Sequence, residues 1–350
     1  MDRKAWIVVI ICSILLALNI HMQSKNSALA AQKAMEKQEA EALANPPLAE
    51  SPAADLPGLV VEKPVLAPSE KPVEHKIETE TNVFTLSSLE GGIKHALFKD
   101  ELAVNDLEQN VLMNDLGPNF IGALVDSTGK TLDVPSYKIK EQTADSVTYI
   151  GRLTNGLGVK KTWSKATEGD GADYRLSLNL ELVNLGDTSV SLGNLFLSTG
   201  SAAPLIDTEQ TRYRSFFWQA EGDFESEMQT YFEGGMMSKE KLEFVEEIES
   251  GVEFSGVENQ FFATIVDPID LYRATVRARP KTIELPDSRG GLTAKIIFSS
   301  LSLPDETLDA NGTKTLKFDI YVGPKNNSLI RSLDGEKGGV MNYGFFSPIS

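Results

Sequence analysis

A single apolar run near the N-terminus constrains this chain more than any other stretch. Residues 5–20, AWIVVIICSILLALNI, are strongly apolar, and Arg3 and Lys4 precede them. A helix rises about 1.5 Å per residue, so the run spans roughly 24 Å, slightly less than a bilayer core of roughly 30 Å. Positive charge before an apolar helix keeps that end in the cytoplasm. The pattern predicts a transmembrane anchor over residues 1–22, with the rest of the chain exported. The residues expected to form the membrane anchor include Trp6, Ile10, Leu15 and Leu18.

A cleaved signal peptide is the alternative for the same segment. Residues 28–30, Ala-Leu-Ala, have the small-x-small form of a signal-peptidase site. They lie about ten residues beyond the apolar run, with Lys25 and Asn26 between, so retention of the helix is favoured.

The composition excludes several classes of protein. Cys12 is the one cysteine and lies inside the apolar run, so the exported part has no disulfide and depends on its hydrophobic core. The formal net charge is −17, whereas phosphate binding needs clustered Lys and Arg, so no nucleic acid partner is expected. The sequence holds only three histidines, too few for a histidine-rich metal site. No cofactor is expected.

Residues 23–78 are rich in Ala, Glu and Pro. Seven prolines occur from Pro46 to Pro72, and such a composition cannot bury a core. A ligand for a proline-binding domain is the alternative, but no motif repeats. The segment is predicted to be an extended linker.

Between residues 79 and 325, short runs of alternating polarity are separated by turn residues. Residues 174–183 are the clearest, because apolar side chains occupy every second position there. That period of two is typical of a half-buried strand. Strands separated mainly by Gly, Asp and Asn favour an all-β domain, an antiparallel β-sandwich, over a parallel α/β sheet. The expected strands are residues 82–87, 146–152, 174–183, 188–197, 259–266, 272–279, 292–299 and 315–322.

Two stretches depart from this pattern. Residues 238–248, SKEKLEFVEEI, place Leu242, Val245 and Ile248 at helical spacing, which predicts a short helix or, alternatively, a charged excursion from the sheet. Residues 326–350 begin as a polar connector and end in VMNYGFFSPIS, whose aromatic residues suit either the start of an interfacial segment or a tail packed against the body.

The sequence contains no motif that specifies catalysis. It has no G-x-S-x-G, H-E-x-x-H, P-loop or paired C-x-x-C. Residues 168–173 resemble part of a calcium loop but lack its closing glutamate, so a hairpin turn is predicted. Consecutive aromatic residues after Ser215 either line a partner groove or pack in the core, and core packing is favoured. The candidate partner contacts are Phe216, Phe217, Trp218 and Leu242.

Five segments in chain order resemble the YidC family of bacterial membrane protein insertases. Residues 1–19 resemble the first transmembrane segment of that family. Residues 82–100, NVFTLSSLEGGIKHALFKD, are similar to its first exported strands, and residues 257–266, VENQFFATIV, to a motif of Asn-Lys-Tyr-Phe type. Residues 318–325, FDIYVGPK, resemble the closure of the exported domain, and residues 341–350 resemble the segment before the second transmembrane helix.

The resemblance implies a twisted, galactose-mutarotase-like β-sandwich with a short helix, placed in the periplasm and anchored in the inner membrane with its N-terminus in the cytoplasm. It implies a role in inserting and folding inner-membrane proteins, with Sec translocon components and nascent membrane proteins as partners. The insertase core of the family is a bundle of five transmembrane helices, and no second apolar run follows residue 22. We therefore expect a non-catalytic interaction domain, truncated before that core or belonging to a split system.

Two other functions stay open. A carbohydrate-active or sugar-binding envelope protein can use the same sandwich, but sugar epimerisation needs histidine and carboxylate partners in a cleft. The body after the linker contains only His95. A passive envelope scaffold would differ from an insertase domain mainly in its partners.

Overall fold

The computed structural model describes residues 71–103, 106–132, 137–169, 171–206, 208–234, 239–333 and 340. The chain divides into two compact units, Met1–Val65 and Leu66–Ser350, and all described residues belong to the second. The predicted anchor and the predicted interfacial segment after residue 340 lie outside the described residues. Within the described ranges, no helix has both the length and the apolar character needed to cross a bilayer.

The largest layer is a nine-stranded antiparallel sheet, in the order β13-β12-β15-β16-β20-β9-β8-β7-β6. Its strands are β6 (Lys138–Gln142), β7 (Ser146–Arg152), β8 (Leu157–Lys165), β9 (Arg175–Asn184), β12 (Ser215–Ala220), β13 (Asp223–Met228), β15 (Phe254–Glu258), β16 (Phe262–Pro268) and β20 (Thr313–Pro324). In β9, leucine occupies every second position from Leu176 to Leu182 and is buried each time. The predicted alternation of this strand is confirmed.

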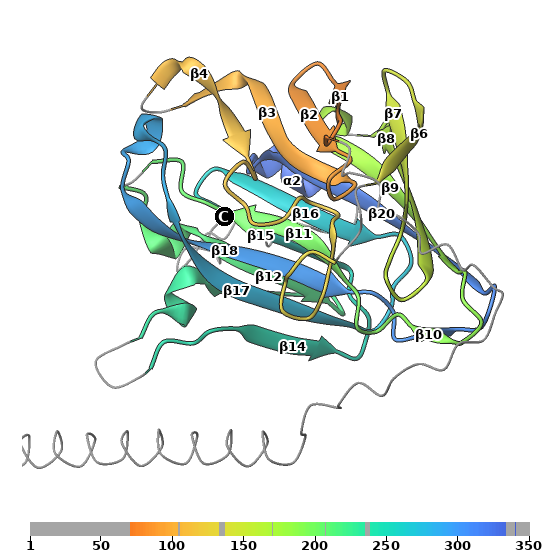
Figure 1. Ribbon diagram of the computed structural model, residues 1–350. Coiled ribbons are helices and arrows are strands. Elements are labelled where there is room, and N and C mark those ends of the chain that lie inside the picture. The colour runs from red at the N-terminus through yellow and green to blue at the C-terminus, as the bar shows by residue number, and fades with distance from the viewer. Residues whose placement is uncertain are drawn as a thin grey trace, which may run out of the picture. The chain divides into compact units, whose positions relative to one another are not determined.

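A five-stranded sheet, in the order β14-β17-β18-β11-β5, packs against the inner face of the larger sheet. Its strands are β5 (Leu124–Val125), β11 (Phe196–Ala202), β14 (Phe244–Ile248), β17 (Ala274–Glu284) and β18 (Thr293–Ser302). Phe216 and Val257 of the larger sheet share one buried cluster with Val276 and Ile297 of the smaller sheet. This packing of two antiparallel sheets confirms the sandwich (Figure 1).

Two smaller sheets complete the layers. The first has the order β1-β2-β3-β4 and the second pairs β10 with β19. Their strands are β1 (Glu74–Glu78), β2 (Asn82–Ser87), β3 (Gly92–Ala103), β4 (Asp106–Met113), β10 (Val190–Ser191) and β19 (Thr307–Leu308). Phe84 and Phe98 of the four-stranded sheet join Trp163 and Leu178 of the nine-stranded sheet in the main core. Strand β1 falls within the last residues of the segment predicted as a linker and pairs with β2.

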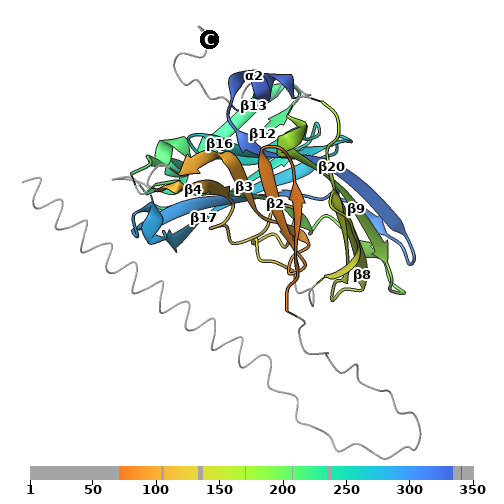
Figure 2. The same cartoon turned by 90° about the horizontal axis from the view of Figure 1, so that it is seen from above.

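The outer face of the nine-stranded sheet carries the short helix α2 (Asn327–Ser332). The side-chain oxygen of Asn326 caps this helix by accepting hydrogen bonds from the backbone N–H groups of Ser328, at 3.1 Å, and Leu329, at 3.3 Å. Ile330 packs in a cluster with Phe217, on the side of the sheet away from β17 (Figure 2). The single-turn 3-10 helices are η1 (Ala172–Tyr174), η2 (Thr211–Tyr213), η3 (Gln229–Phe232) and η4 (Asp287–Arg289).

The prediction of a single strand over residues 188–197 is wrong. It contains β10 and the start of β11, and a turn separates them in which the Leu195 N–H donates to the Leu192 carbonyl at 2.9 Å. The other seven predicted strands occur, with ends that differ by up to five residues. The predicted hairpin turn at residues 168–173 lies between β8 and β9, which pair antiparallel.

The predicted helix over residues 238–248 is also wrong. Its second half forms β14, which pairs with β17 through Phe244↔Ala278 and Ile248↔Ala274. The helical spacing relied on Leu242 and Val245, but both side chains are exposed, and Phe244 is buried instead. Pairing with β17 therefore outweighs the local helical pattern. The structure also places α2 at the start of the segment predicted as a connector.

Candidate functional site

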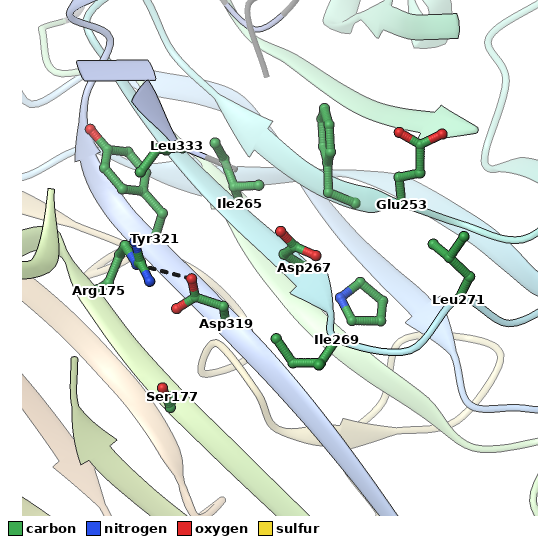
Figure 3. Close-up of a pocket in the computed structure, with 12 residues that line it drawn as sticks. Arg175, Ser177, Glu253, Ile265, Asp267, Ile269, Leu271, Asp319, Tyr321 and Leu333 are labelled. Carbon is green, nitrogen blue, oxygen red and sulfur yellow. Dashed lines mark ion pairs between the residues drawn. The ribbon is translucent and has the colours of Figure 1, made fainter. Parts of the chain in front are cut away.

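A groove of about 420 Å³ crosses the outer face of the nine-stranded sheet beside α2 (Figure 3). Strands β9, β20 and β16 contribute its central side chains, and the loop after β16 contributes its rim. The volume lies within the roughly 300–1,000 Å³ of typical ligand sites.

The pairing register of the strands determines which side chains meet in the groove. Tyr321 of β20 lies opposite both Ile265 of β16 and Arg175 of β9. Two residues earlier on β20, Asp319 lies opposite both Asp267 and Ser177. Since residues two apart on a strand share a face, these two rows of side chains lie next to each other on the outer surface.

An ion pair joins the two rows. The Nε of Arg175 lies 2.9 Å from an Oδ of Asp319, and Figure 3 shows both side chains beside Asp267. Two carboxylates directly opposite each other on neighbouring strands repel, so the guanidinium stabilises this part of the sheet.

Glu253 places a further carboxylate at the groove. It accepts hydrogen bonds of 2.7 Å from the side-chain amide of Gln219 and of 2.7 Å from the backbone N–H of Gly222. These bonds attach the end of β12 and the turn after it to the residue before β15. The lining thus holds three carboxylates and one guanidinium.

The rest of the groove is apolar. Phe254, Ile265 and Leu333 belong to the buried cluster under α2 and form its floor with Tyr321. Burial raises the pKa of Tyr321, and its hydroxyl donates to the Pro324 carbonyl at 2.6 Å. Ile269 and Leu271 form the rim and are 60% and 63% exposed.

The predicted partner contacts divide between the core and the surface. Phe216 and Trp218 point to the inner side of the sheet and stack with their ring centroids 6.0 Å apart. Phe217 points to the outer side and packs against Phe254, under the groove. All three side chains are buried, which agrees with the favoured interpretation that these aromatic residues pack in the core. Leu242 is 75% exposed, so it is the one predicted contact with a large free surface.

Two further titratable side chains, Lys161 and His95, lie outside the groove lining. Fully buried Lys161 lies inside the sandwich, and burial lowers its pKa to about 7. His95 on β3 is half-buried, and burial lowers its pKa as well. His95 is not among the residues that line the groove. Among the described residues, no three His, Cys, Asp or Glu side chains are grouped so as to hold a metal ion.

The sequence predicted the polar face that carries Arg175 and Ser177, but not the groove. Asp267 and Asp319 lie opposite each other only because of the register in which β16 pairs with β20. The alternation of single strands indicates which face each residue occupies, and gives no information on its neighbour across the sheet.

Comparisons with known proteins give one family and a set of distant folds. The model of the YidC periplasmic domain family matches residues 76–350. No curated protein matches the chain. Among solved structures, a putative aldose 1-epimerase from Escherichia coli K12 is 11% identical with a TM-score of 0.43, and covers 72% of this chain and 99% of its own. A galactose mutarotase-like protein from Lactobacillus casei is 11% identical with a TM-score of 0.46, at 72% and 100% coverage. Galactose 1-epimerase from Lactobacillus acidophilus is 9% identical with a TM-score of 0.36, at 72% and 95% coverage.

Proposed function

Because this chain belongs to the YidC periplasmic domain family, we propose that it is the exported interaction part of a membrane protein insertase. Residues 1–22 anchor it in the bacterial inner membrane with the N-terminus in the cytoplasm, and the β-sandwich lies in the periplasm. Its partners are Sec translocon components and nascent inner-membrane proteins. The observation that carries the proposal is the family match over residues 76–350, which includes nearly every strand of the sandwich.

Under this proposal the domain acts by binding and performs no chemistry. Sugar epimerisation, the alternative, needs a histidine and a carboxylate that face one cavity, whereas none of the described residues that line the groove is a histidine. We expect the full chain and its His95→Asn variant to show the same background rate of aldose mutarotation. A rate above background that the substitution abolishes would favour the carbohydrate-active alternative.

Photo-crosslinking in cells tests the partners. The full chain would carry p-benzoylphenylalanine at Leu242, and at Leu185 as a matched exposed position on another loop. We expect crosslinks from position 242 to Sec translocon subunits or to stalled nascent inner-membrane proteins, detected by immunoblot. Equal labelling from both positions, or the absence of both partners, would contradict the proposal.

A membrane extraction experiment tests the anchor. We expect the full chain to stay in the membrane fraction after an alkaline carbonate wash. A Leu15→Asp, Leu18→Asp variant should be released, because each charge near a helix centre costs roughly 2.5–3.5 kcal/mol of insertion free energy. Release of the unaltered chain, or detection of a mature N-terminus after Ala30, would instead support signal-peptide cleavage.

A further inference from the structure

We propose that Asn311, in the turn between β19 and β20, is an acceptor site for an N-linked oligosaccharide. The sequence contains two asparagines in the acceptor form Asn-x-Ser/Thr, at residues 311–313 and 326–328. The structure treats these two sites differently. The inference goes beyond the proposed function and takes from it only the placement of the sandwich outside the cytoplasm.

The first site presents its recognition side chains to solvent. Asp309, Asn311 and Thr313 are exposed, and none of the described residues forms a hydrogen bond with their side chains. Asn311 has a φ of 61°, in the left-handed region that asparagine adopts more readily than most residues. The amide that accepts the oligosaccharide therefore lies in solvent at a tight turn.

The second site is already used by the fold. The Oδ1 of Asn326 accepts the Ser328 hydroxyl at 2.7 Å, in addition to the two backbone N–H groups at the start of α2. The asparagine and the hydroxyl residue of this site are thus bonded to each other in the helix cap. An enzyme must break the cap before it can bind either side chain.

The residue two positions before the asparagine also separates the sites. Asp309 occupies this position in the first site, and Pro324 occupies it in the second. Bacterial oligosaccharyltransferases accept the form Asp/Glu-x-Asn-x-Ser/Thr, in which the carboxylate offers a charge contact to the enzyme. Residues 309–313, DANGT, have this form.

Asn184 holds the turn at the end of the large sheet. The Asn311 N–H donates to the Asn184 carbonyl at 3.0 Å, and the Asn184 N–H donates to the Gly312 carbonyl at 2.9 Å. The next pair along the ladder is Thr313↔Val183. Strand ends open locally at a much lower free energy than the core does. The turn can therefore enter an enzyme while most of β20 stays paired.

The place of the turn on β20 keeps an oligosaccharide clear of the groove. Strand β20 begins at Thr313, whereas its groove residues are Asp319 and Tyr321. At about 3.4 Å per residue, Asp319 lies about 20 Å farther along the strand than Thr313. The modification is therefore compatible with an open groove.

The reaction is a group transfer without a change of oxidation state. The amide nitrogen of Asn311 attacks the anomeric carbon of an oligosaccharide that is carried on a polyprenyl diphosphate. A bond forms between that nitrogen and that carbon, and the bond from the carbon to the diphosphate oxygen breaks, with its electron pair leaving on the diphosphate. One amide proton passes to a base of the oligosaccharyltransferase.

The test uses the purified full chain in detergent with a bacterial oligosaccharyltransferase and a polyprenyl-diphosphate-linked oligosaccharide. Mass spectrometry of the intact chain and of its peptides measures the product. We expect one oligosaccharide per chain, attached at Asn311. Asn311→Asp, which also tolerates a positive φ, should abolish the product. Thr313→Val should abolish it as well, whereas Thr313→Ser should retain it.

Two further variants test the charge contact and the second site. Asp309→Asn should lower the initial rate roughly tenfold, because the amide keeps the shape but removes the charge. Asn326→Asp is the matched control and should leave the product unchanged. Urea unfolding of each variant checks that the sandwich is intact. No product, a product at Asn326, or a product that survives Asn311→Asp would overturn the proposal.

Expression in bacterial cells that contain the same enzyme and donor separates this inference from the proposed function. We expect the chain to be modified at Asn311 in these cells too. A product in the purified system that is absent in cells would support the acceptor site and count against placement of the sandwich in the periplasm. The absence of product in both would overturn the inference, while crosslinking and membrane extraction still decide the insertase proposal.

Discussion

Lys161, fully buried on β8, donates a hydrogen bond of 2.9 Å to the backbone carbonyl of Glu90. Its ammonium also donates to the Gly122 carbonyl at 2.8 Å and lies over the ring of Tyr137. The Glu90 carboxylate accepts from the Phe120 backbone N–H at 2.7 Å. One lysine thus holds the turn between β2 and β3 and the loop before β5 against the large sheet.

Replacing this lysine should destabilise the sandwich strongly. Lys161→Met leaves two buried carbonyl oxygens without this donor and removes a positive charge that opposes the raised pKa of Glu90, which costs about 3 kcal/mol. Urea unfolding followed by tryptophan fluorescence measures the loss. Lys138→Met, at an exposed position on β6, is the control and should stay within about 0.5 kcal/mol of the unaltered protein. Equal losses in both variants would contradict the structural role.

The same lysine predicts how stability depends on pH. Burial lowers the pKa of Lys161 from 10.5 to about 7. Between these two values the unfolded chain binds a proton that the folded chain has released, so the free energy of unfolding rises with pH. The difference between the unaltered protein and Lys161→Met should therefore grow from about pH 7 to about pH 9.5. Urea unfolding at several pH values checks this, and a flat or falling difference would show that Lys161 stays charged in the fold.

Strand alternation made the core of the large sheet predictable, because one strand can be assigned a buried face from its own sequence. Leu176 and Leu178 lie on that face in the structure as expected. The run Phe216 to Trp218 shows the limit of this method. Three consecutive aromatic residues fit a strand only when both faces are covered, and the covering element on the outer face is α2, more than a hundred residues later.

The groove depends on the same kind of long-range information. Arg175 was predicted on a polar face, and Asp319 lies on the polar face of another predicted strand. Their ion pair exists because β9 and β20 are neighbours in a register that pairs Tyr321 with Arg175. No local sequence pattern determines which strands become neighbours in the sheet. The groove could therefore be identified only from the folded structure.

Removing the cation of the groove should weaken the sheet. Arg175→Met leaves Asp267 and Asp319 opposite each other without the guanidinium, and we expect a loss of about 1–2 kcal/mol. Because the remaining repulsion is between partly exposed charges, the loss should shrink in about 1 M NaCl. Arg152→Met, at the exposed end of β7, is the control. Chemical unfolding at low and high salt measures both effects, and a loss that salt does not change would point to lost packing instead of charge.

The final prediction concerns a buried ion pair that joins two segments of the family resemblance. The Glu258 carboxylate accepts a hydrogen bond of 2.5 Å from the Ser215 hydroxyl and one of 2.9 Å from the Lys325 ammonium. Burial raises the pKa of Glu258, although the lysine opposes the shift. Lys325→Met should therefore cost about 3–5 kcal/mol, because it leaves a buried carboxylate without its cation.

Adding Glu258→Gln to Lys325→Met should restore part of this loss. The neutral amide oxygen still accepts from Ser215, and no unpaired charge remains, so the double variant should be more stable than the sum of the two single changes by about 1–3 kcal/mol. A double-mutant cycle by chemical unfolding measures this coupling, with Lys317→Met on the exposed face of β20 as the control. Additive losses would mean that Lys325 stabilises the chain end through packing, and that the pair contributes no coupling between β15 and the end of β20.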